Sequence, residues 1–378
     1  MFSDNFFRRT ARSLASLGIF VALIGCGSTD KVKPTELGRN PASLGVKAAW
    51  SNGVGRVTFP LDIKVVGNTV YAAGADGTVA ALDGRTGGDV WRVQLKSALT
   101  AGVGSDGRFA AVVSRDNELI AIDAGREVWR AKLSAITLTA PLVAGSRVFV
   151  SSADRSVTAF DAASGRRLWQ QQRTGEALVL RQGGVLVAVG DTLVAGLGGR
   201  LVGLNPQNGS VRWEVPVANS RGTNEVERLV DLVAGSSRSG DQLCVRAFQS
   251  AVSCIDAARG SVVWMKQASG GTGIGGDGNV IYGAETDGTV NAWRRSDGEK
   301  MWSQESLKYR GITGPLLVGG AVVVGDFSGL LHFLSRDKGE TLNRVPTDGS
   351  PIVAGPVMVG STIVVATQRG GVFGFRPE

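Results

Sequence analysis

The chain has 378 residues, of which 43% are apolar and 54 are glycine. This composition excludes a disordered chain, and glycines scattered among short aliphatic runs indicate short strands joined by tight turns. The net charge of +8 is spread along the sequence with acidic residues between the basic ones, so we expect no nucleic-acid partner.

The N-terminal segment has the pattern of an export signal. Three arginines within the first 12 residues precede an apolar run at residues 14–24, which is too short to cross a bilayer as a helix. The sequence Leu-Ile-Gly-Cys ends at Cys26 and resembles the lipobox of bacterial lipoproteins. The resemblance implies that residues 1–25 are removed as a signal peptide and that Cys26 is acylated, for example with palmitate. An ordinary secretory signal with a chance cysteine is the alternative.

The residues after Cys26 indicate a destination and a spacer. Lipoproteins held in the inner membrane typically have Asp after the acylated cysteine. Gly27 stands there in this chain, which implies the periplasmic face of the outer membrane. Residues 26–45 are polar, contain two prolines and show no apolar period, so we expect a flexible tether. The folded body then comprises residues 46–378.

A repeat of roughly forty residues follows the tether. The segment before most repeated tryptophans has two alternating strands joined by a turn such as Ala75-Asp76-Gly77, then a second turn and a strand that ends at the tryptophan. An aliphatic strand precedes this pattern, and four strands per repeat are the unit of a β-propeller blade. The repeated tryptophans, at intervals of 38 to 51 residues, are Trp50, Trp91, Trp129, Trp169, Trp213, Trp264 and Trp302.

The repeat count predicts an all-β fold, a closed ring of eight blades. The tryptophans from Trp91 to Trp302, together with the equivalent Asn343, mark seven units. The strands within residues 352–375 have no following tryptophan segment, and Trp50 has no preceding strands. We therefore expect residues 46–51 to form the outer strand of the last blade and to close the ring.

The repeat A-x-D-G-x-x-x-A-x-D-x-x-x-G-x-x-x-W resembles the PQQ-like propeller repeat over residues 46–378. With its lipobox, the chain is similar to the propeller lipoproteins of the outer-membrane β-barrel assembly (BAM) machinery. The resemblance implies a scaffold without a cofactor that binds BamA and other BAM subunits and assists insertion of β-barrel proteins. Unfolded barrel proteins are a further candidate partner, captured by strand addition. The departures are Asn343 for tryptophan and Arg294 and Ser335 for the repeated aspartate.

An enzyme on the same fold is the alternative. PQQ-dependent quinoprotein dehydrogenases share this propeller and resemble one another in an adjacent cysteine pair, an acidic base and a calcium site. No two cysteines are adjacent here, and the recurring aspartates indicate turn capping rather than a catalytic pair. His332, the single histidine, lies in a strand pattern without a nucleophile motif. We therefore expect no catalytic or metal-ligating residues.

The repeat alignment also pairs two cysteines. Cys244 and Cys254 occupy positions that flank a three-residue turn symmetrically, so they should face each other across an antiparallel hairpin. Opposed residues there have Cα atoms roughly 4.5 to 5.5 Å apart, which suits a disulfide, and the periplasm oxidises such pairs. Two reduced structural thiols are the alternative.

Two intervals exceed the others, at 44 residues after Trp169 and 51 after Trp213. Both surpluses fall between the outer strand of one blade and the inner strand of the next, so two neighbouring loops emerge on one face and can form a platform. In the assembly lipoproteins, an L-x-L-R segment and an E-x-x-R-L-x-D segment in these loops dock BamA, and Val233 stands where the family often has a second acid. Tolerated insertions are the alternative. The residues that match these motifs are Leu178, Leu180, Arg181 and Asp231.

Overall fold

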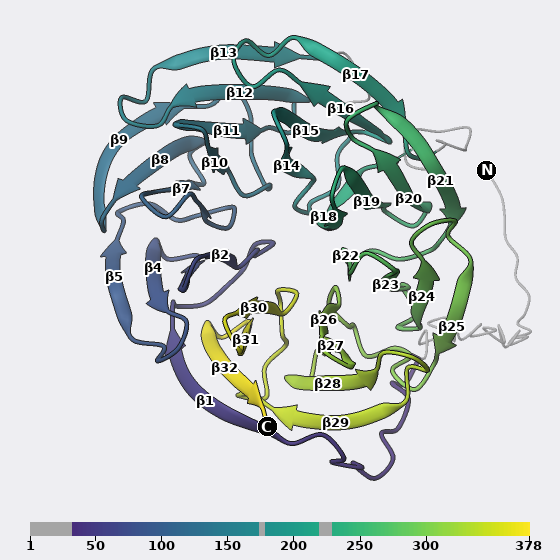
Figure 1. Cartoon of the computed structure of the whole chain (residues 1–378). Helices are drawn as coiled ribbons and strands as arrows, with labels where there is room; N and C mark the ends of the chain where they lie inside the picture. Colours follow the sequence, from purple (N-terminus) through teal and green to yellow (C-terminus); the bar gives the residue numbers. More distant parts are fainter. Residues whose placement is uncertain (1–31, 174–177, 219–228) are drawn as a thin grey trace, which may run out of the picture. The chain divides into compact units, whose positions relative to one another are not determined.

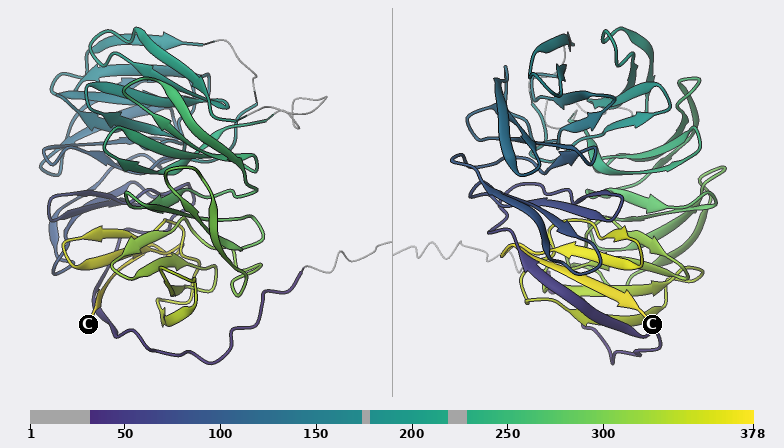
Figure 2. Two further views of the ribbon diagram at one scale, coloured as in Figure 1. Left: turned by 45° about the vertical axis from the view of Figure 1, so that its right-hand side comes forward. Right: turned by 60° about the vertical axis from the view of Figure 1, so that its left-hand side comes forward.

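Eight four-stranded antiparallel sheets surround a central channel (Figure 1). The computed structural model describes residues 32–173, 178–218 and 229–378. Within those ranges the regular secondary structure consists of β-strands. The side views show the twisted sheets following one another around the ring (Figure 2). The predicted eight-bladed propeller is confirmed.

Each blade extends from an inner strand at the channel to an outer strand at the rim. Blades 1 to 4 consist of β2 (Lys64–Val66), β3 (Thr69–Ala73), β4 (Thr78–Asp83) and β5 (Asp89–Gln94); β6 (Gly104–Ser105), β7 (Phe109–Val113), β8 (Glu118–Asp123) and β9 (Arg126–Lys132); β10 (Leu142–Ala144), β11 (Arg147–Ser151), β12 (Ser156–Asp161) and β13 (Arg167–Gln172); and β14 (Leu186–Val189), β15 (Thr192–Leu197), β16 (Arg200–Leu204) and β17 (Val211–Pro216). Blades 5 to 8 consist of β18 (Leu232–Ser239), β19 (Gln242–Ala247), β20 (Ala251–Asp256) and β21 (Ser261–Gln267); β22 (Ile274–Gly276), β23 (Val280–Ala284), β24 (Val290–Arg294) and β25 (Lys300–Gln304); β26 (Leu316–Val318), β27 (Ala321–Gly325), β28 (Leu330–Ser335) and β29 (Thr341–Pro346); and β30 (Val357–Val359), β31 (Thr362–Ala366), β32 (Gly371–Pro377) and β1 (Val46–Gly53).

The N-terminal strand closes the ring, as the repeat count predicted. β1 pairs antiparallel with β32, from Val46 opposite Pro377 to Gly53 opposite Gly371. Figure 1 shows the purple β1 beside the yellow β32. The last blade is therefore built from both ends of the propeller sequence.

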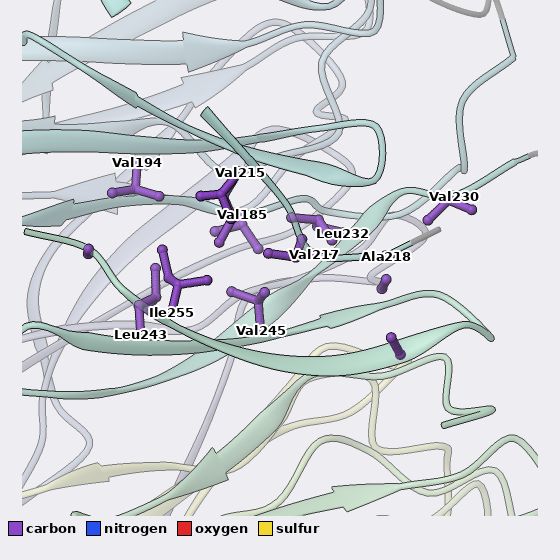
Figure 3. Packing of buried hydrophobic residues seen from close by; sticks show 14 of the residues in the cluster. Val185, Val194, Val215, Val217, Ala218, Val230, Leu232, Leu243, Val245 and Ile255 are labelled. Atoms are coloured by element: carbon purple, nitrogen blue, oxygen red, sulfur yellow. The ribbon is translucent and has the colours of Figure 1, made fainter. Parts of the chain in front are cut away.

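The hydrophobic core lies between neighbouring blades. The second and third strands are buried on both faces, as residues 78–82 of β4 show, whereas the outer strand β5 alternates between exposed and half-buried residues. The cluster between blades 4 and 5 joins Val194 and Val215 of one sheet to Leu243 and Ile255 of the next (Figure 3). Because both faces of a blade are apolar, each blade depends on its neighbours for burial.

The repeated tryptophans pack between blades. Trp129 on β9 donates its Nε1–H to the carbonyl of Ala162 at 2.8 Å, in the turn before the outer strand of blade 3. Gly165 of that turn has a φ of +72°, and a Cβ there would lie 2.6 Å from the Trp129 ring, so glycine is required twice over. Equivalent contacts join Trp50 to Gly87, Trp91 to Gly125, Trp169 to Gly209, Trp213 to Gly260, Trp264 to Gly298 and Trp302 to Gly339.

Asn343 replaces tryptophan at the seam between blades 7 and 8, and the fold explains why. The chain enters β1 from the N-terminal segment, so this seam lacks the glycine turn against which a tryptophan packs at the other seams. Asn343 instead donates its Nδ2–H to the Leu44 carbonyl at 2.7 Å and accepts the Asn40 Nδ2–H at 2.9 Å. This departure from the repeat therefore fastens the incoming chain.

Residues 34–45 lie along the rim of blade 7 instead of hanging free, which differs from the expected tether. The Thr35 N–H donates to the Lys308 carbonyl at 3.0 Å, and the Ser43 N–H donates to the Leu342 carbonyl at 2.9 Å. Leu37 packs against the apolar cluster of blades 6 and 7. The segment contributes mainly its own backbone N–H and C=O groups to its hydrogen bonds, so these contacts leave no apolar period in its sequence. The predicted signal peptide and Cys26 lie outside the described residues, and in the described part of the chain no helix is long and apolar enough to span a membrane.

Three of the four repeated aspartates, Asp83, Asp161 and Asp256, cap turns as predicted, whereas the Asp123 carboxylate pairs with Arg108. The Asp83 carboxylate accepts the backbone N–H groups of Thr86 and Arg85 at 2.8 and 3.0 Å, and Asp161 accepts the Ser164 N–H at 2.8 Å. Hydrogen bonds from Thr86 to the ionised carboxylate lower the pKa of Asp83.

His332 lies fully buried on β28 in a polar cluster, which agrees with a structural role. Its Nε2 is 3.0 Å from Asp326 Oδ2, and the Arg310 Nε–H donates to the same oxygen at 2.9 Å. Burial alone would raise the pKa of Asp326, but the hydrogen bonds from His332, the Leu330 N–H and Arg310 outweigh it and lower this pKa. The Arg310 guanidinium also donates to the Thr35 carbonyl at 3.2 Å, so the cluster holds the N-terminal segment.

Candidate functional site

The two long loops emerge on one face of the ring, which we call the loop face. This face carries every connection from an outer strand to the next inner strand and every turn between the second and third strands of a blade. Residues 173–185 connect blades 3 and 4, and residues 217–231 connect blades 4 and 5. Residues 174–177 and 219–228 lie outside the described residues, so the E-x-x-R part of the second motif has no structural description.

Asp231, which immediately precedes β18, joins the two loops. Its Oδ2 accepts the Leu180 N–H at 2.8 Å, and its Oδ1 accepts an N–H of the Arg155 guanidinium at 3.0 Å. Its carbonyl accepts the Phe248 N–H of blade 5 at 2.9 Å. The side chain thus links blade 3, the first long loop and the start of blade 5, and it is only 16% exposed. The structure therefore gives this predicted docking residue an internal role.

Arg155 completes this linkage, and the sequence analysis missed it. The guanidinium also donates to the Leu178 carbonyl at 3.1 Å, and the side chain is 13% exposed. Arg155 lies in the turn between β11 and β12 with a φ of 61°, at the place where blade 1 has Gly77. A large residue rarely adopts the left-handed backbone conformation unless contacts of its side chain compensate for the strain. In the sequence, arginine replaces the turn glycine of the repeated Asp-Gly pair at this position, and this replacement could have identified Arg155 as a functional residue.

The three residues of the L-x-L-R match differ in exposure. Leu178 is 38% exposed, Arg181 is exposed and Leu180 is half-buried. Within the described part of the chain, the Arg181 guanidinium forms no hydrogen bond or ion pair. Ile136, from the loop between blades 2 and 3, adds a further apolar side chain that is 43% exposed. The loop face therefore presents apolar side chains and a free cation on a segment fixed from beneath.

A small cavity of about 70 Å³ lies beneath this segment, lined by Leu180, Leu138 and Asp231. Val233 also lines the cavity and is buried, on β18 opposite Arg246. The position where the family often has a second acid thus faces the interior in this chain. The structure brings Leu180 and Asp231 into direct contact and leaves Leu178 and Arg181 at the surface.

The predicted disulfide is present. Cys244 on β19 lies opposite Cys254 on β20 with their Cα atoms 4.0 Å apart, and their sulfurs are bonded. Both residues are fully buried between blades 5 and 6, where Arg295 donates to Cys244 Sγ at 3.3 Å. The pair is a structural staple inside the core.

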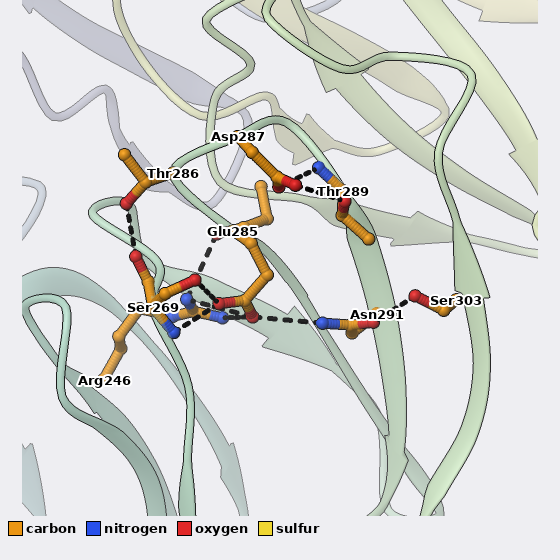
Figure 4. Close-up of polar contacts among 9 residues, drawn as sticks. Arg246, Ser269, Glu285, Thr286, Asp287, Thr289, Asn291 and Ser303 are labelled. Carbon is orange, nitrogen blue, oxygen red and sulfur yellow. Dashed lines mark hydrogen bonds and ion pairs between the residues drawn. The ribbon is translucent and has the colours of Figure 1, made fainter.

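The same seam buries a second arginine, Arg246, which requires glycine at positions 270 and 283. The Arg246 guanidinium is inaccessible to solvent and forms an ion pair with Glu285 (Figure 4). A Cβ at Gly270 would overlap its Nη1, and one at Gly283 would overlap its Nη2. Ser269 and Asn291 also donate to the Glu285 carboxylate. Gly270 therefore makes room for a buried ion pair.

The inner strands enclose a channel cavity of about 680 Å³, lined largely by glycines and aliphatic residues. Asp62 lies on its wall with its side chain exposed to the channel, and desolvation by the surrounding channel walls raises the pKa of its carboxyl to about 6. Within residues 32–173, 178–218 and 229–378, no three His, Cys, Asp or Glu side chains come together as a metal site would require.

Fold, repeat and loops together define a PQQ-like-repeat β-propeller with a platform on one face. The sequence profile described as outer membrane protein assembly factor BamB matches residues 75–304. The outer membrane protein assembly factor BamB of Burkholderia pseudomallei is 37% identical over 380 residues, which cover 99% of this chain and 100% of the relative. The chain therefore belongs to the BamB family of outer membrane protein assembly factors.

Solved structures agree with this family membership. The crystal structure of BamB from Moraxella catarrhalis is similar with a TM-score of 0.80 and 25% identity, over 88% of this chain and 100% of that one. Quinohemoprotein alcohol dehydrogenase from Comamonas testosteroni is similar with a TM-score of 0.69, over 89% of this chain and 77% of that one. At 17% identity, the dehydrogenase shares the fold alone.

Proposed function

We propose that this protein is a non-catalytic scaffold of the outer-membrane β-barrel assembly machinery. It is anchored by acylated Cys26 on the periplasmic face of the outer membrane and docks BamA on the loop face. The family membership supports assembly rather than quinone chemistry. The observation that carries the docking site is the fixed loop: Asp231 and Arg155 hold its backbone, while Leu178 and Arg181 remain exposed.

This arrangement suits the centre of a protein interface. Ordering a loop before binding removes an entropic cost that association would otherwise carry. An apolar side chain beside an arginine supplies contact area and a fork of hydrogen-bond donors, and such residues are frequent hot spots. The partner surface should therefore offer an apolar recess beside a carboxylate or carbonyl oxygens.

Co-purification from detergent-solubilised membranes tests this proposal. Arg181→Glu should weaken retention of BamA at least about tenfold, which corresponds to roughly 1.4 kcal/mol, because a carboxylate replaces the donor fork. Arg166→Glu is the matched control, since Arg166 is exposed on a turn of blade 3 at the opposite face. Undiminished retention by a folded Arg181→Glu protein, or an equal loss with Arg166→Glu, would refute the docking assignment.

A further inference from the structure

Two aromatic side chains stand out on the surface. Among the described residues, Tyr309 and Phe327 are the aromatic residues classed as exposed, at 45% and 39%, whereas the tryptophans and the other phenylalanines and tyrosines are buried or half-buried. Tyr309 belongs to the loop between blades 6 and 7, and Phe327 belongs to the turn between β27 and β28. We call these two residues the aromatic patch.

The aromatic patch is held together by the backbone. The Phe327 N–H donates to the Arg310 carbonyl at 3.1 Å, and the Arg310 guanidinium lies 5.6 Å from the Phe327 ring centroid. Both members lie on the loop face, because this face carries the connections between blades and the turns between second and third strands. Their neighbouring backbones therefore present both rings at the same corner of blade 7.

The N-terminal segment leaves the propeller at the aromatic patch. Thr35 is bonded to the residues on either side of Tyr309: its N–H donates to the Lys308 carbonyl, and its carbonyl accepts from Arg310. Pro34 lies eight positions after Cys26. A flexible chain of that length spans roughly 16 Å on average, and fully extended it reaches no more than about 29 Å. An anchor at Cys26 therefore keeps this corner close to the lipid surface.

The chemistry of the corner suits a lipid headgroup region. Tyrosine is favoured in this region because it combines an apolar ring with a polar hydroxyl, and phenylalanine is common on apolar faces that bind at the membrane surface. The charged residues of the loop and the turn that carry the aromatic patch are paired: Lys308 lies 2.8 Å from Glu305, and Arg310 lies 2.9 Å from Asp326. Contact with lipid would thus desolvate neutral pairs rather than isolated charges.

We propose that Tyr309 and Phe327 insert into the headgroup region of the leaflet that holds the lipid anchor. The contact turns the blade 7 edge of the ring toward the membrane and fixes the orientation of the loop face. This inference rests on the proposed acylation of Cys26. The anchor supplies most of the membrane affinity, and the aromatic patch supplies orientation through a second, weaker attachment.

A depth probe tests the contact on the mature lipoprotein in phosphatidylethanolamine and phosphatidylglycerol vesicles. Phe327→Cys introduces a thiol for an environment-sensitive fluorophore. The native cysteines do not compete, because Cys26 is acylated and the other two form the disulfide. Arg115→Cys is the matched control: Arg115 is the equivalent turn residue of blade 2, with its N–H bonded to the Ala98 carbonyl at 2.7 Å. Lipid nitroxides near the headgroups should quench the probe at residue 327 at least about threefold more than the probe at residue 115.

A second measurement removes the aromatic patch itself. Tyr309→Ser combined with Phe327→Ser should reduce quenching of a probe at Glu305→Cys to the level seen at residue 115, with the circular dichroism spectrum unchanged. Mass spectrometry of Cys26 separates the two ways of failing. An acylated protein whose probes at residues 327 and 115 are quenched equally overturns the inference alone, and an unacylated Cys26 overturns the proposed anchor and the inference with it. If a BamA-containing complex shields the probe at residue 327 and lipid does not, the aromatic patch binds a protein, and the inference of lipid contact is overturned.

Discussion

Replacing Asp231 by asparagine should loosen the loop that carries Leu178 and Arg181. The carboxylate accepts the Leu180 N–H and an N–H of Arg155, and Arg155 in turn holds the Leu178 carbonyl. Asparagine has nearly the same size but no charge, and it keeps a single carbonyl oxygen. The substitution therefore weakens the linkage between loops while leaving the packing around it almost unchanged.

The magnitude follows from the exposure of the pair. An exposed ion pair contributes about 0–1 kcal/mol, whereas breaking a buried one costs about 3–5 kcal/mol. At 13% and 16% exposure, Arg155 and Asp231 lie between these limits. Because hydrogen bonds to charged groups contribute about 1.5–3 kcal/mol, we expect a local loss near 2 kcal/mol.

Hydrogen exchange at the Leu180 amide measures this loss directly. Its rate in Asp231→Asn should rise at least about tenfold, since 1.4 kcal/mol corresponds to a factor of ten. Binding of BamA should weaken less than this, because affinity falls only with the fraction of molecules in which the loop is ordered. Asp191→Asn is the control, since it removes a surface ion pair with Arg212 from an 84% exposed carboxylate.

Two results would refute this reasoning. Unchanged exchange at Leu180 in Asp231→Asn would show that the carboxylate does not hold the loop. A comparable increase in Asp191→Asn would show that the effect is a general response to lost charge.

Three further predictions concern stability. Gly165→Ala should lower the free energy of unfolding in urea by about 3 kcal/mol, because a Cβ would overlap the Trp129 ring. Gly145→Ala, where φ is +58° but the surrounding space is open, should lower it clearly less, and equal losses would contradict the tryptophan contact. Folding lowers the pKa of Asp326, so its ionised carboxylate stabilises the folded state above the unfolded pKa, and this stabilisation is lost as the pH falls below about 4. Asp326→Asn should therefore unfold at a lower urea concentration at pH 7, and its stability should fall less steeply in acid. An unchanged dependence of stability on acid pH would contradict this. Folding raises the pKa of Asp62 to about 6, so between about pH 4 and 6 the folded state binds more protons than the unfolded state and loses stability as the pH rises. Asp62→Asn should therefore have a higher melting temperature than the unaltered protein at pH 7.5 but not at pH 4. A lower melting temperature of the variant at pH 7.5 would contradict this.

Periodicity made the propeller predictable from sequence. Each blade repeats the same strands, turns and tryptophan, so the count of units and the leftover strand around Trp50 determined both the blade number and the ring closure. The same alignment set the register that places Cys244 opposite Cys254.

The parts that escaped prediction depend on contacts between distant and non-repeating residues. The attachment of residues 34–45 to blade 7 is made largely by backbone groups, which polar side chains do not reveal. Arg155 and Asp231 are 76 residues apart, and only the folded ring brings them together. Asp231 matched a docking motif, but the sequence could not show that its carboxylate faces inward to another loop.

The closure of the ring has a consequence for biosynthesis. β1 is made first, yet its partner β32 is completed only at residue 377, so the first strand waits through the synthesis of seven blades. Contacts this distant in sequence form slowly, and until they form the incomplete ring keeps apolar blade faces and strand edges exposed. A chain shortened by its last eight residues would lose β32, which is the third strand of the final blade and the partner of β1. Covering these apolar surfaces therefore requires that the last strand of the propeller has been made and has paired with the first.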